Sequence, residues 1–480
     1  MSSYSREVLP SARRLIGSLR DIGYSLSSAL ADLVDNSISA GATLVQIDMR
    51  FEGAGSWMRI ADNGCGMTWR QLEEALRFGS RREYEPNELG RYGLGLKLAT
   101  LSQCRLMTVA SRVAVGGRVA IRQWDLDHVE ETDRWEILRP TSQEVERFMT
   151  EPLAGGPGTV VMLEDLDRVL RYANPDGSRA EHNFDQALSE VQDHLSMVFH
   201  RFLSGEARSH KRLTVLLNGV ALSAWDPFCR EEPATRDLPS TTLSLRDAET
   251  RGAVKVHPYI LPNEAAFSSH EAHTQAGGPK RWNGQQGLYV YRNDRLIQSG
   301  GWARLRTADE HTKLARVAVE FSSSLDDRFG LNIAKSQVRL PRSLRDELAQ
   351  VIAAVAQLAQ REYRAGVTPS SGSNQSRGQS HDPRAKALQE LVALVVEGCE
   401  AALREELGSE SLVVRRAMRC LRSMEQRFAT ELEEIITGSP LPTAKRSDTP
   451  STEGDPTTYF DGRGVKSVIS PSGARASVVR

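Results

Sequence analysis

Hydrophobic residues between Ser25 and Gly41 recur at three- and four-residue intervals, with a serine at the start and a glycine at the end. This spacing and these end residues predict a helix. Met58 and Ile60, on either side of Arg59, predict a short strand at 58–61, and the helix predicted after it has Leu72 and Leu76 on its inner side. Helices and short strands that share one segment predict an α/β sandwich within an α+β protein.

The same periodicities continue in a second segment. Residues 213–217 predict a strand that ends in an Asn-Gly turn, and the alternating residues 288–291 predict another. A helix is expected from about Leu344. Beyond it, residues 366–384 lose their apolar positions and fill with Ser, Gly, Gln and Pro, a composition typical of flexible linkers.

These patterns divide the 480 residues into five segments. Helical spacing returns after the linker on both sides of Gly408-Ser409, and the end of the chain is rich in Pro, Ser, Thr and Gly. We therefore expect a first domain at 1–205, a second at 206–365, the linker at 366–384, a helical hairpin or coiled coil at 385–437 and a disordered tail at 438–480.

Composition narrows the class of protein. The chain is 40% hydrophobic and 26% charged, as in ordinary globular proteins, and no apolar run approaches the roughly 20 residues that cross a bilayer. Its first residues lack the apolar core of a signal peptide. We therefore expect a cytoplasmic protein without a membrane segment, and the formal net charge of −1 provides no overall attraction to nucleic acid.

Cysteine and histidine patterns do not predict a metal site. The five cysteines are odd in number and widely spaced, which indicates reduced thiols. His270 and His273 could be joined by His257, but they lie in a predicted loop rich in Ser, Ala and Gly without further ligands at zinc spacing. We therefore do not expect metal binding there.

The first candidate for chemistry is the pair Asp32 and Asn36. Residues four apart lie one above the other on a helix, so a carboxylate and a carboxamide face one place. The carboxylate can accept a proton from an attacking water, and the amide oxygen can bind Mg²⁺. A polar helix end on the surface is the alternative.

The second candidate follows the predicted strand, in the sequence Asp62-Asn-Gly64-Cys-Gly66-Met67. Two glycines allow positive φ and a close backbone approach to a flat ligand, while the carboxylate of Asp62 can accept from an exocyclic amine such as that of adenine. A plain Asp-Asn-Gly turn is the alternative.

The third candidate is the run Gly90-Arg-Tyr-Gly93-Leu-Gly95-Leu-Lys97, which leads directly into a predicted helix. Unpaired N–H groups at such a helix start can cradle phosphates. The spacing matches neither a dinucleotide fingerprint nor a P-loop. The polar residues 79–89 before it are typical of a mobile lid, or of a solvated loop.

A fourth piece, Gly156-Pro-Gly158-Thr159, enters a strand with a hydroxyl at its start. The four pieces in this order closely resemble the GHKL superfamily of gyrase, heat-shock chaperone, histidine kinase and MutL ATPases. DNSISAGAT at 35–43, ADNGCGM at 61–67 and GRYGLGLKLAT at 90–100 look most like its MORC and MutL branches. The second segment looks like a MORC-type transducer in LTVLLNGVALSAWDPF at 213–228, GQQGLYVYRNDRLI at 284–297 and FGLNIAKSQVRLP at 329–341.

The resemblance implies a Bergerat-type α/β sandwich that binds ATP and Mg²⁺, followed by an α/β transducer domain. It also implies a role for each matching residue. Asp32 stands at the position of the general base, Asn36 at that of the magnesium ligand and Asp62 at that of the adenine acceptor. Lys335 stands at that of the transducer lysine that reaches the terminal phosphate. The remaining nucleotide contacts implied are Gly64, Gly66, Met67, Gly90, Gly93, Gly95, Lys97 and Thr159.

One residue departs from the family pattern. The family base is ordinarily Glu, whereas Asp32 is one methylene shorter, so we expect slow hydrolysis. Asp35 is a less suitable substitute, because we expect it to point away from the face that Asp32 and Asn36 share.

The resulting hypothesis is an ATPase of MORC-like character that closes into a homodimer on binding ATP. DNA or a nuclease partner, in DNA transactions or restriction-type defence, is implied by the resemblance alone. Two alternatives stay open: an ATP-binding interaction switch with little turnover, and a chaperone-like ATPase that acts on protein clients. The helical segment 385–437 contains no histidine, which argues against a histidine kinase.

Overall fold

The computed structural model describes residues 10–79, 95–208, 210–246, 251–331, 335 and 338–367. These residues belong to one compact unit. Gly90, Gly93, almost all of the predicted lid and linker, the predicted hairpin and the predicted tail lie outside the described residues.

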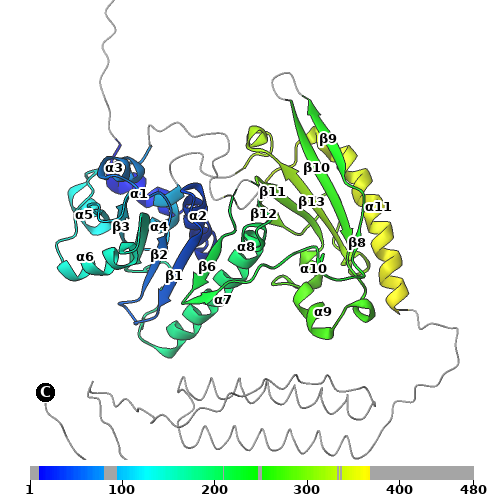
Figure 1. Cartoon of the computed structure of the whole chain (residues 1–480), viewed down its shortest axis with the longest axis horizontal. Coiled ribbons are helices and arrows are strands. Elements are labelled where there is room, and N and C mark those ends of the chain that lie inside the picture. Colours follow the sequence, from blue (N-terminus) through cyan, green and yellow to red (C-terminus); the bar gives the residue numbers. More distant parts are fainter. Residues whose placement is uncertain are drawn as a thin grey trace, which may run out of the picture. The chain divides into compact units, whose positions relative to one another are not determined.

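The first of two sheets contains seven strands in the order β4-β3-β5-β2-β1-β6-β7 (Figure 1). Its neighbouring strands are antiparallel, except that β1 and β6 are parallel. The strands are β1 Leu44–Arg50, β2 Trp57–Asp62, β3 Leu106–Arg112, β4 Ala120–Asp125, β5 Gly158–Glu164, β6 Thr214–Leu217 and β7 Val220–Ala221.

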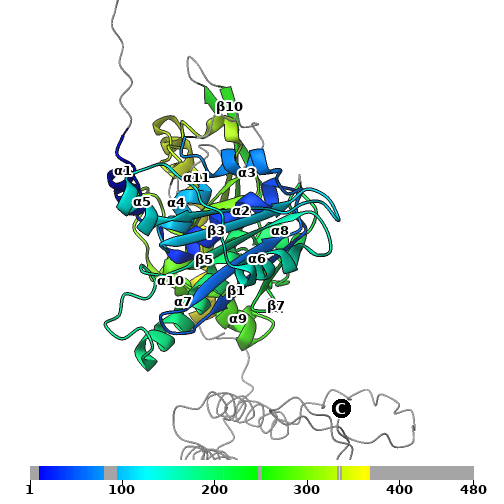
Figure 2. The same ribbon diagram turned by 90° about the vertical axis from the view of Figure 1, so that its left-hand side faces the viewer.

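Helices lie against both faces of this sheet, which faces the viewer in Figure 2. Apolar side chains of α2, α3 and α7 pack into the larger core on one face, while α6 and η1 cover a smaller apolar cluster on the other. The helical elements are α1 Ala12–Arg20, α2 Leu26–Ser39, α3 Trp69–Leu76, α4 Gly95–Leu101, α5 Leu126–Thr132, α6 Gln143–Thr150, η1 Glu151–Leu153, α7 Ser178–Val198 and α8 His200–Ser204.

The second sheet contains six strands, with the path β12-β11-β13-β10-β8 and β9 paired to β10. The pair β11 and β13 is parallel, and the others are antiparallel. The strands are β8 Arg236–Asp237, β9 Thr241–Arg246, β10 Arg251–Ile260, β11 Gly287–Arg292, β12 Arg295–Ser299 and β13 Ala315–Phe321.

One long helix packs along the second sheet (Figure 1). Leu344, Leu348 and Ile352 of this helix, α11, enter the apolar core with valines of β10 and β13. The helical elements after α8 are η2 Glu264–Ala266, α9 His270–Ala276, α10 Arg281–Gln285, η3 Glu310–Thr312, η4 Ser323–Leu325 and α11 Arg342–Val367.

The fold confirms the α+β class and the strands expected at 58–61, 213–217 and 288–291. It also shows two differences. The strand β6 pairs with β1, so the first sheet draws on residues beyond the predicted boundary at residue 205. The strand β11 is buried on both faces, because Tyr289 and Tyr291 pack against Phe228 on the side away from α11.

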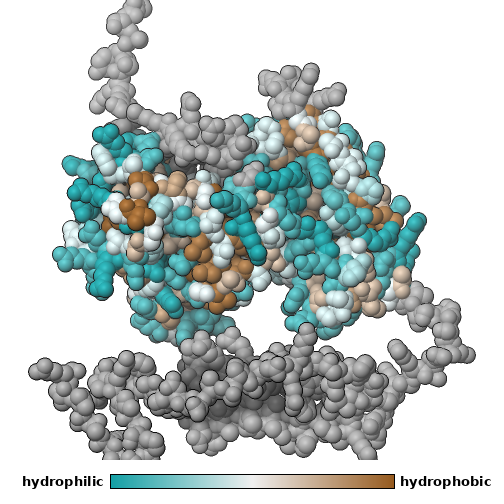
Figure 3. Space-filling model, viewed as in Figure 1, coloured by the Kyte–Doolittle hydropathy of each residue, from teal (hydrophilic) through white to brown (hydrophobic). Residues whose placement is uncertain are grey.

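Hydrophilic residues cover most of the described surface in Figure 3, and apolar residues gather there in small patches. Among the described residues, no helix is both long and apolar enough to cross a membrane.

The centre of the first sheet is expected to carry much of its stability. Ile47 of β1 is fully buried, so Ile47→Ala should lower the free energy of unfolding by about 2–5 kcal/mol through lost burial and a cavity. Val220 in β7 is 70% exposed, so Val220→Ala should change it by less than about 0.5 kcal/mol. Urea unfolding followed by circular dichroism measures both, and equal effects would contradict this assignment of the core.

Candidate functional site

Two buried carboxylates lie on the helix α2. Ser25 begins this helix by accepting a hydrogen bond from the N–H of Ser28 (3.2 Å), and Asp32 and Asp35 follow at 1% and 0% exposure. Residues three apart on a helix are neighbours. Asp35 was expected to point off the face that Asp32 and Asn36 share, yet one cation contacts both Asp32 and Asp35.

That cation is Lys335, which lies about three hundred residues further along the chain. Its Nζ donates to Oδ1 of Asp32 at 3.1 Å and to Oδ2 of Asp35 at 2.8 Å. Lys335 is only 9% exposed and has a positive φ of 45°. The lysine singled out by the sequence thus contacts the carboxylate singled out by the sequence.

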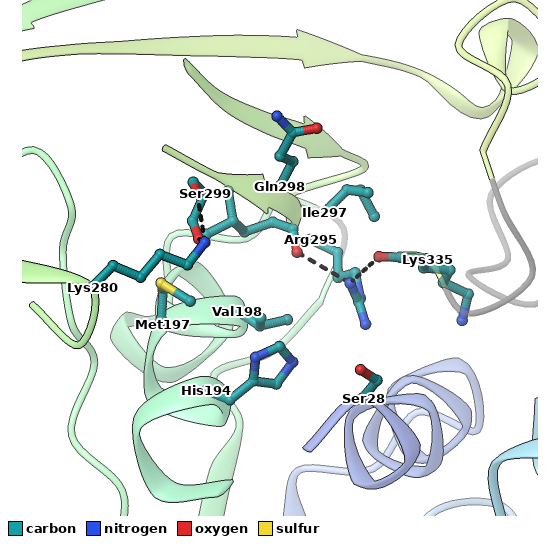
Figure 4. A pocket seen from close by; sticks show the side chains of 11 residues that line it. Ser28, His194, Met197, Val198, Lys280, Arg295, Ile297, Gln298, Ser299 and Lys335 are labelled. Atoms are coloured by element: carbon teal, nitrogen blue, oxygen red, sulfur yellow. Dashed lines mark hydrogen bonds between the residues drawn. The ribbon is translucent and has the colours of Figure 1, made fainter. Parts of the chain in front are cut away.

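Arg295, at the start of β12, completes the group. Its Nε lies 3.1 Å from both carboxylate oxygens of Asp35, and its guanidinium also donates to the backbone oxygen of Lys335 at 3.2 Å (Figure 4). We call Asp32, Asp35, Arg295 and Lys335 the charge cluster. Its two carboxylates and two cations balance in formal charge, and it joins α2 to the second sheet.

Burial alone would raise the pKa of Asp35, but Arg295 and Lys335 outweigh it and hold the pKa below the ordinary value. Asp32 has a further partner, since the hydroxyl of Tyr24 donates to its Oδ2 at 2.7 Å. Burial and the neighbouring Asp32 raise the pKa of Tyr24, which keeps this hydroxyl a donor. Both oxygens of Asp32 therefore accept hydrogen bonds from the chain itself.

Asn36 lies one turn beyond Asp32 on the same helix and is half-buried. Gly95 is close to Asp32 as well, since a Cβ at Gly95 would stand 3.5 Å from Oδ2 of Asp32. This contact places the start of α4 beside the carboxylate. The structure thus brings Asp32, Asn36, Gly95 and Lys335 into one region.

Asp62 lies at the end of β2, on the other side of α2. Its Oδ1 accepts from the N–H of Gly64 at 2.9 Å and its Oδ2 from the hydroxyl of Ser37 at 3.0 Å. Burial raises the pKa of Asp62, and these hydrogen bonds oppose the rise. Ser37 follows Asn36 directly, so α2 contacts both parts of the candidate site.

Strand register places Thr159 beside Asp62. Asp62 pairs with Thr159 across β2 and β5, and Thr159 pairs with Ser111 across β5 and β3. The hydroxyls of Ser111 and Thr159 lie 2.9 Å apart, and Ser111 accepts from the N–H of Met67 at 2.8 Å. One row of the sheet thus gathers Asp62, Thr159 and Met67.

The fold itself requires glycine at positions 64 and 66. A Cβ at Gly64 would stand 2.7 Å from that of Ala40, and one at Gly66 would stand 1.9 Å from the backbone oxygen of Arg112. Gly66 also has a positive φ of 67°. Packing of the turn requires glycine at both positions, whether or not a ligand approaches them.

Lys97 does not point to this region. Its Nζ donates to the backbone oxygen of Ala75 at 2.7 Å, near the end of α3, and the residue is 1% exposed. Burial lowers the pKa of Lys97 to about 8. Its role in this structure is to join α3 to α4, because the residue faces inward from a helix packed on both sides.

A cavity of about 140 Å³ adjoins the charge cluster. Arg295 and Lys335 line it together with Ser28 of α2 and His194 of α7, as Figure 4 shows. Burial lowers the pKa of His194 to about 4, so this imidazole is neutral at pH 7. The cavity leaves space beside Lys335.

Sequence reasoning missed Tyr24, Arg295 and Ser111, and it misplaced Asp35. For Ser111 the available signal was a hydroxyl near the end of a mostly apolar strand. For Asp35 it was the i, i+3 spacing from Asp32. Arg295 had no local signal, because its partner is 260 residues away.

The charge cluster makes a prediction about stability. Asp35→Asn should lower the free energy of unfolding by about 3–5 kcal/mol, because it leaves Arg295 and Lys335 with one carboxylate. A second change, Arg295→Met in the Asp35→Asn background, should recover part of the loss. The ion pair of the exposed Asp127 with Arg105 provides the control, since Asp127→Asn should cost less than about 1 kcal/mol.

The contribution of Asp35 to the free energy of unfolding should depend on pH. The pKa of Asp35 in the folded protein lies below its ordinary 3.8, so its contribution is present above that value and lost as the pH falls through the folded pKa. Unfolding measured from pH 7 down to pH 3 should show the difference between wild type and Asp35→Asn narrowing below about pH 4. A constant difference would contradict the ionised state of Asp35.

Comparison with known proteins gives one family match. Residues 24–156 match the family described as histidine kinase-, DNA gyrase B-, and HSP90-like ATPase. This range includes Asp32, Asn36, Asp62 and Gly95, whereas Thr159 and Lys335 lie after it.

Several curated relatives are similar to part of the chain. The DNA mismatch repair protein MutL of Allorhizobium ampelinum is 26% identical over 196 residues, which are 38% of this chain and 27% of the relative. MutL of Haemophilus influenzae is 30% identical over 145 residues, 29% of this chain and 20% of the relative. MutL of Salmonella heidelberg is 38% identical over 93 residues, which are 18% of this chain and 15% of the relative.

The chain thus spans only about a quarter or less of the length of these relatives. The family match and the mixed sheet with α2 and α4 agree with each other. The region that holds Asp32, Asn36 and Asp62 is therefore similar to a GHKL-type ATPase domain. Part of the chain is also weakly similar to MutL.

Proposed function

We propose that this protein is a slow, Mg²⁺-dependent ATPase of MORC-like character that works as a nucleotide-gated dimeric clamp. One observation carries the proposal. Lys335, from the second half of the chain, contacts Asp32, the carboxylate at the position of the family's general base. This hydrogen bond connects the candidate general base directly to the candidate transducer.

The residues around Asp62 fit an adenine. A carboxylate accepts from an exocyclic amine, and the Ser111 and Thr159 hydroxyls stand next to it in the sheet to bind the ring directly or through water. Phosphates would lie toward Gly95, near Asp32, with Gly90 and Gly93 before it in the chain.

Asn36 fits the magnesium. Its carboxamide oxygen is a hard ligand, it is half-buried, and it lies on the helix that also presents Asp32. Bound Mg²⁺ supplies positive charge that stabilises the phosphoryl oxygens in the transition state.

Release of Asp32 is the step that couples the two halves. As long as Lys335 and Tyr24 donate to its two oxygens, the Asp32 carboxylate is stabilised as an anion and is a weaker base toward an attacking water. A terminal phosphate attracts the ammonium of Lys335 away, and the adjoining cavity gives this side chain space to move. Asp32 then loses its cationic partner and becomes a stronger base, and Asp35 stays paired with Arg295.

The biological setting follows from similarity. The relatives are named as DNA mismatch repair proteins, which favours a role in DNA transactions, and the MORC-like motifs suggest restriction-type defence. Two other functions compete: an ATP-binding switch with little turnover, and a chaperone-like ATPase on protein clients. The short side chain of Asp32 favours slow turnover in every case.

Phosphate release tests the assigned residues. Asp32→Asn should lower turnover by about 10²–10⁴-fold, and Lys335→Ala by about 10²–10³-fold, because they remove the base and a cation on the phosphate. Asn36→Ala should abolish it. Lys211→Ala, at an exposed position, is the control and should leave the rate unchanged.

Circular dichroism and equilibrium binding of a labelled ATP analogue complete this test. Variants that stay folded and bind nucleotide but do not turn over support the enzyme. Tight binding without turnover in the wild type would support the interaction switch instead. Full activity in both Asp32→Asn and Asp32→Ala would refute the assigned base.

Molecular mass tests the clamp. In light scattering, a non-hydrolysable ATP analogue should double the mass of the wild type, and Asn36→Ala should stay unchanged because it lacks the metal contact. A mass insensitive to nucleotide would exclude the clamp. Turnover that rises when DNA is added would argue against the chaperone.

A further inference from the structure

Three potential metal ligands meet in the second half of the chain, away from the charge cluster. They are Glu264 of η2 and His270 and His273 of α9, and one ligand atom of each lies within 4.8 Å of the other two. Nδ1 of His270 is 3.8 Å from Oε1 of Glu264. Nothing in the proposed ATPase uses these side chains.

The helix α9 explains why the histidines converge. Residues three apart on a helix share a face, so His270 and His273 point to the same side. The ring of His273 stacks on Trp282 with centroids 4.7 Å apart and planes 24° apart, and it also meets the edge of Phe267 at 5.2 Å. These contacts fix the orientation of one imidazole before any ion binds.

The backbone that carries the other two ligands is anchored as well. Asn263, just before Glu264, donates to Glu362 of α11 at 2.9 Å. The N–H and hydroxyl of Ser268 donate to Glu232 at 2.9 and 2.7 Å. Side-chain rotation alone can therefore bring Glu264 and His270 closer together.

The structure gives a different set of possible metal ligands from the one that the sequence suggested. In the sequence, His257 was the third candidate, but its Nε2 lies 2.5 Å from Oδ1 of Asp237. Glu264 takes its place, although it lies six residues before His270. The segment from His270 to Ala276 is a helix and not the expected loop.

We propose that Glu264, His270 and His273 form a binding site for Zn²⁺. Two imidazoles and a carboxylate are the three-ligand set that zinc accepts, with water in the fourth position. Tetrahedral bonds of about 2.0–2.1 Å place ligand atoms roughly 3.3–3.5 Å apart. The pair at 3.8 Å needs little movement, and the Glu264 and His270 side chains are 68% and 83% exposed and free to rotate.

The occupied site joins η2 to α9 and holds His273 against Trp282 of α10. Since α10 leads directly into β11, the ion stabilises the segment that precedes this strand of the second sheet. Zn²⁺ binding at this site does not depend on the proposed ATP binding.

The test uses the full chain after removal of metals with a chelator. Zn²⁺ is titrated in competition with a chromophoric chelator. The wild type should bind one ion, and His270→Ala and Glu264→Gln should each weaken this site at least about tenfold, by the loss of one ligand. His182→Ala, an exposed histidine on α7, is the matched control and should bind like the wild type.

Co²⁺ absorption gives a second readout. Nitrogen and oxygen ligands produce visible tetrahedral bands in the wild type, which His270→Ala should lose while its circular dichroism stays unchanged. Equal Zn²⁺ binding by wild type and both variants would overturn the proposal. So would thiolate-to-cobalt bands, which would assign the ion to cysteines.

Discussion

The charge cluster is a buried contact that restricts how the two sheets can be arranged. Asp35 lies on α2 against the first sheet, whereas Arg295 begins an edge strand of the second. Neither charge can be buried without the other, because an unpaired ion in the interior costs several kcal/mol. Any placement of the second sheet that separates Arg295 from Asp35 is therefore unfavourable.

A buried ion pair is seldom the most stabilising choice, since well-packed apolar residues of similar volume are often as good or better. Charges have another property, however, because a competing anion can change their partners. Lys335 donates to both Asp32 and Asp35. If Lys335 moves away, Asp35 is still paired with Arg295. The cluster can therefore lose one contact without leaving an unpaired carboxylate at Asp35, which suits a switch better than a static core.

Much of the first half could be predicted from the sequence, because its signals are local. Ser25 and the spacing of apolar residues predict α2, and the end of β2 correctly places Asp62 before a glycine turn. The row that joins Asp62, Thr159 and Ser111 needs strand register, which no local pattern contains. Arg295 and Tyr24 are recognised only by their distant or buried partners. Lys97 was misleading, because a lysine beside a glycine motif looks the same whether it faces a ligand or the carbonyl of Ala75.

The pairing of β6 with β1 has a consequence for how the chain can be divided. The strand β1 lies between β2 and β6, so a shortened protein that stopped after α8 would expose the N–H and C=O groups along one side of β1. Bare strand edges recruit other strands, which leads to aggregation. The smallest self-contained N-terminal piece therefore extends to Ala221. The first sheet can close only after the ribosome has added β6, so this half cannot finish folding before the helices that lead to the second half have been made.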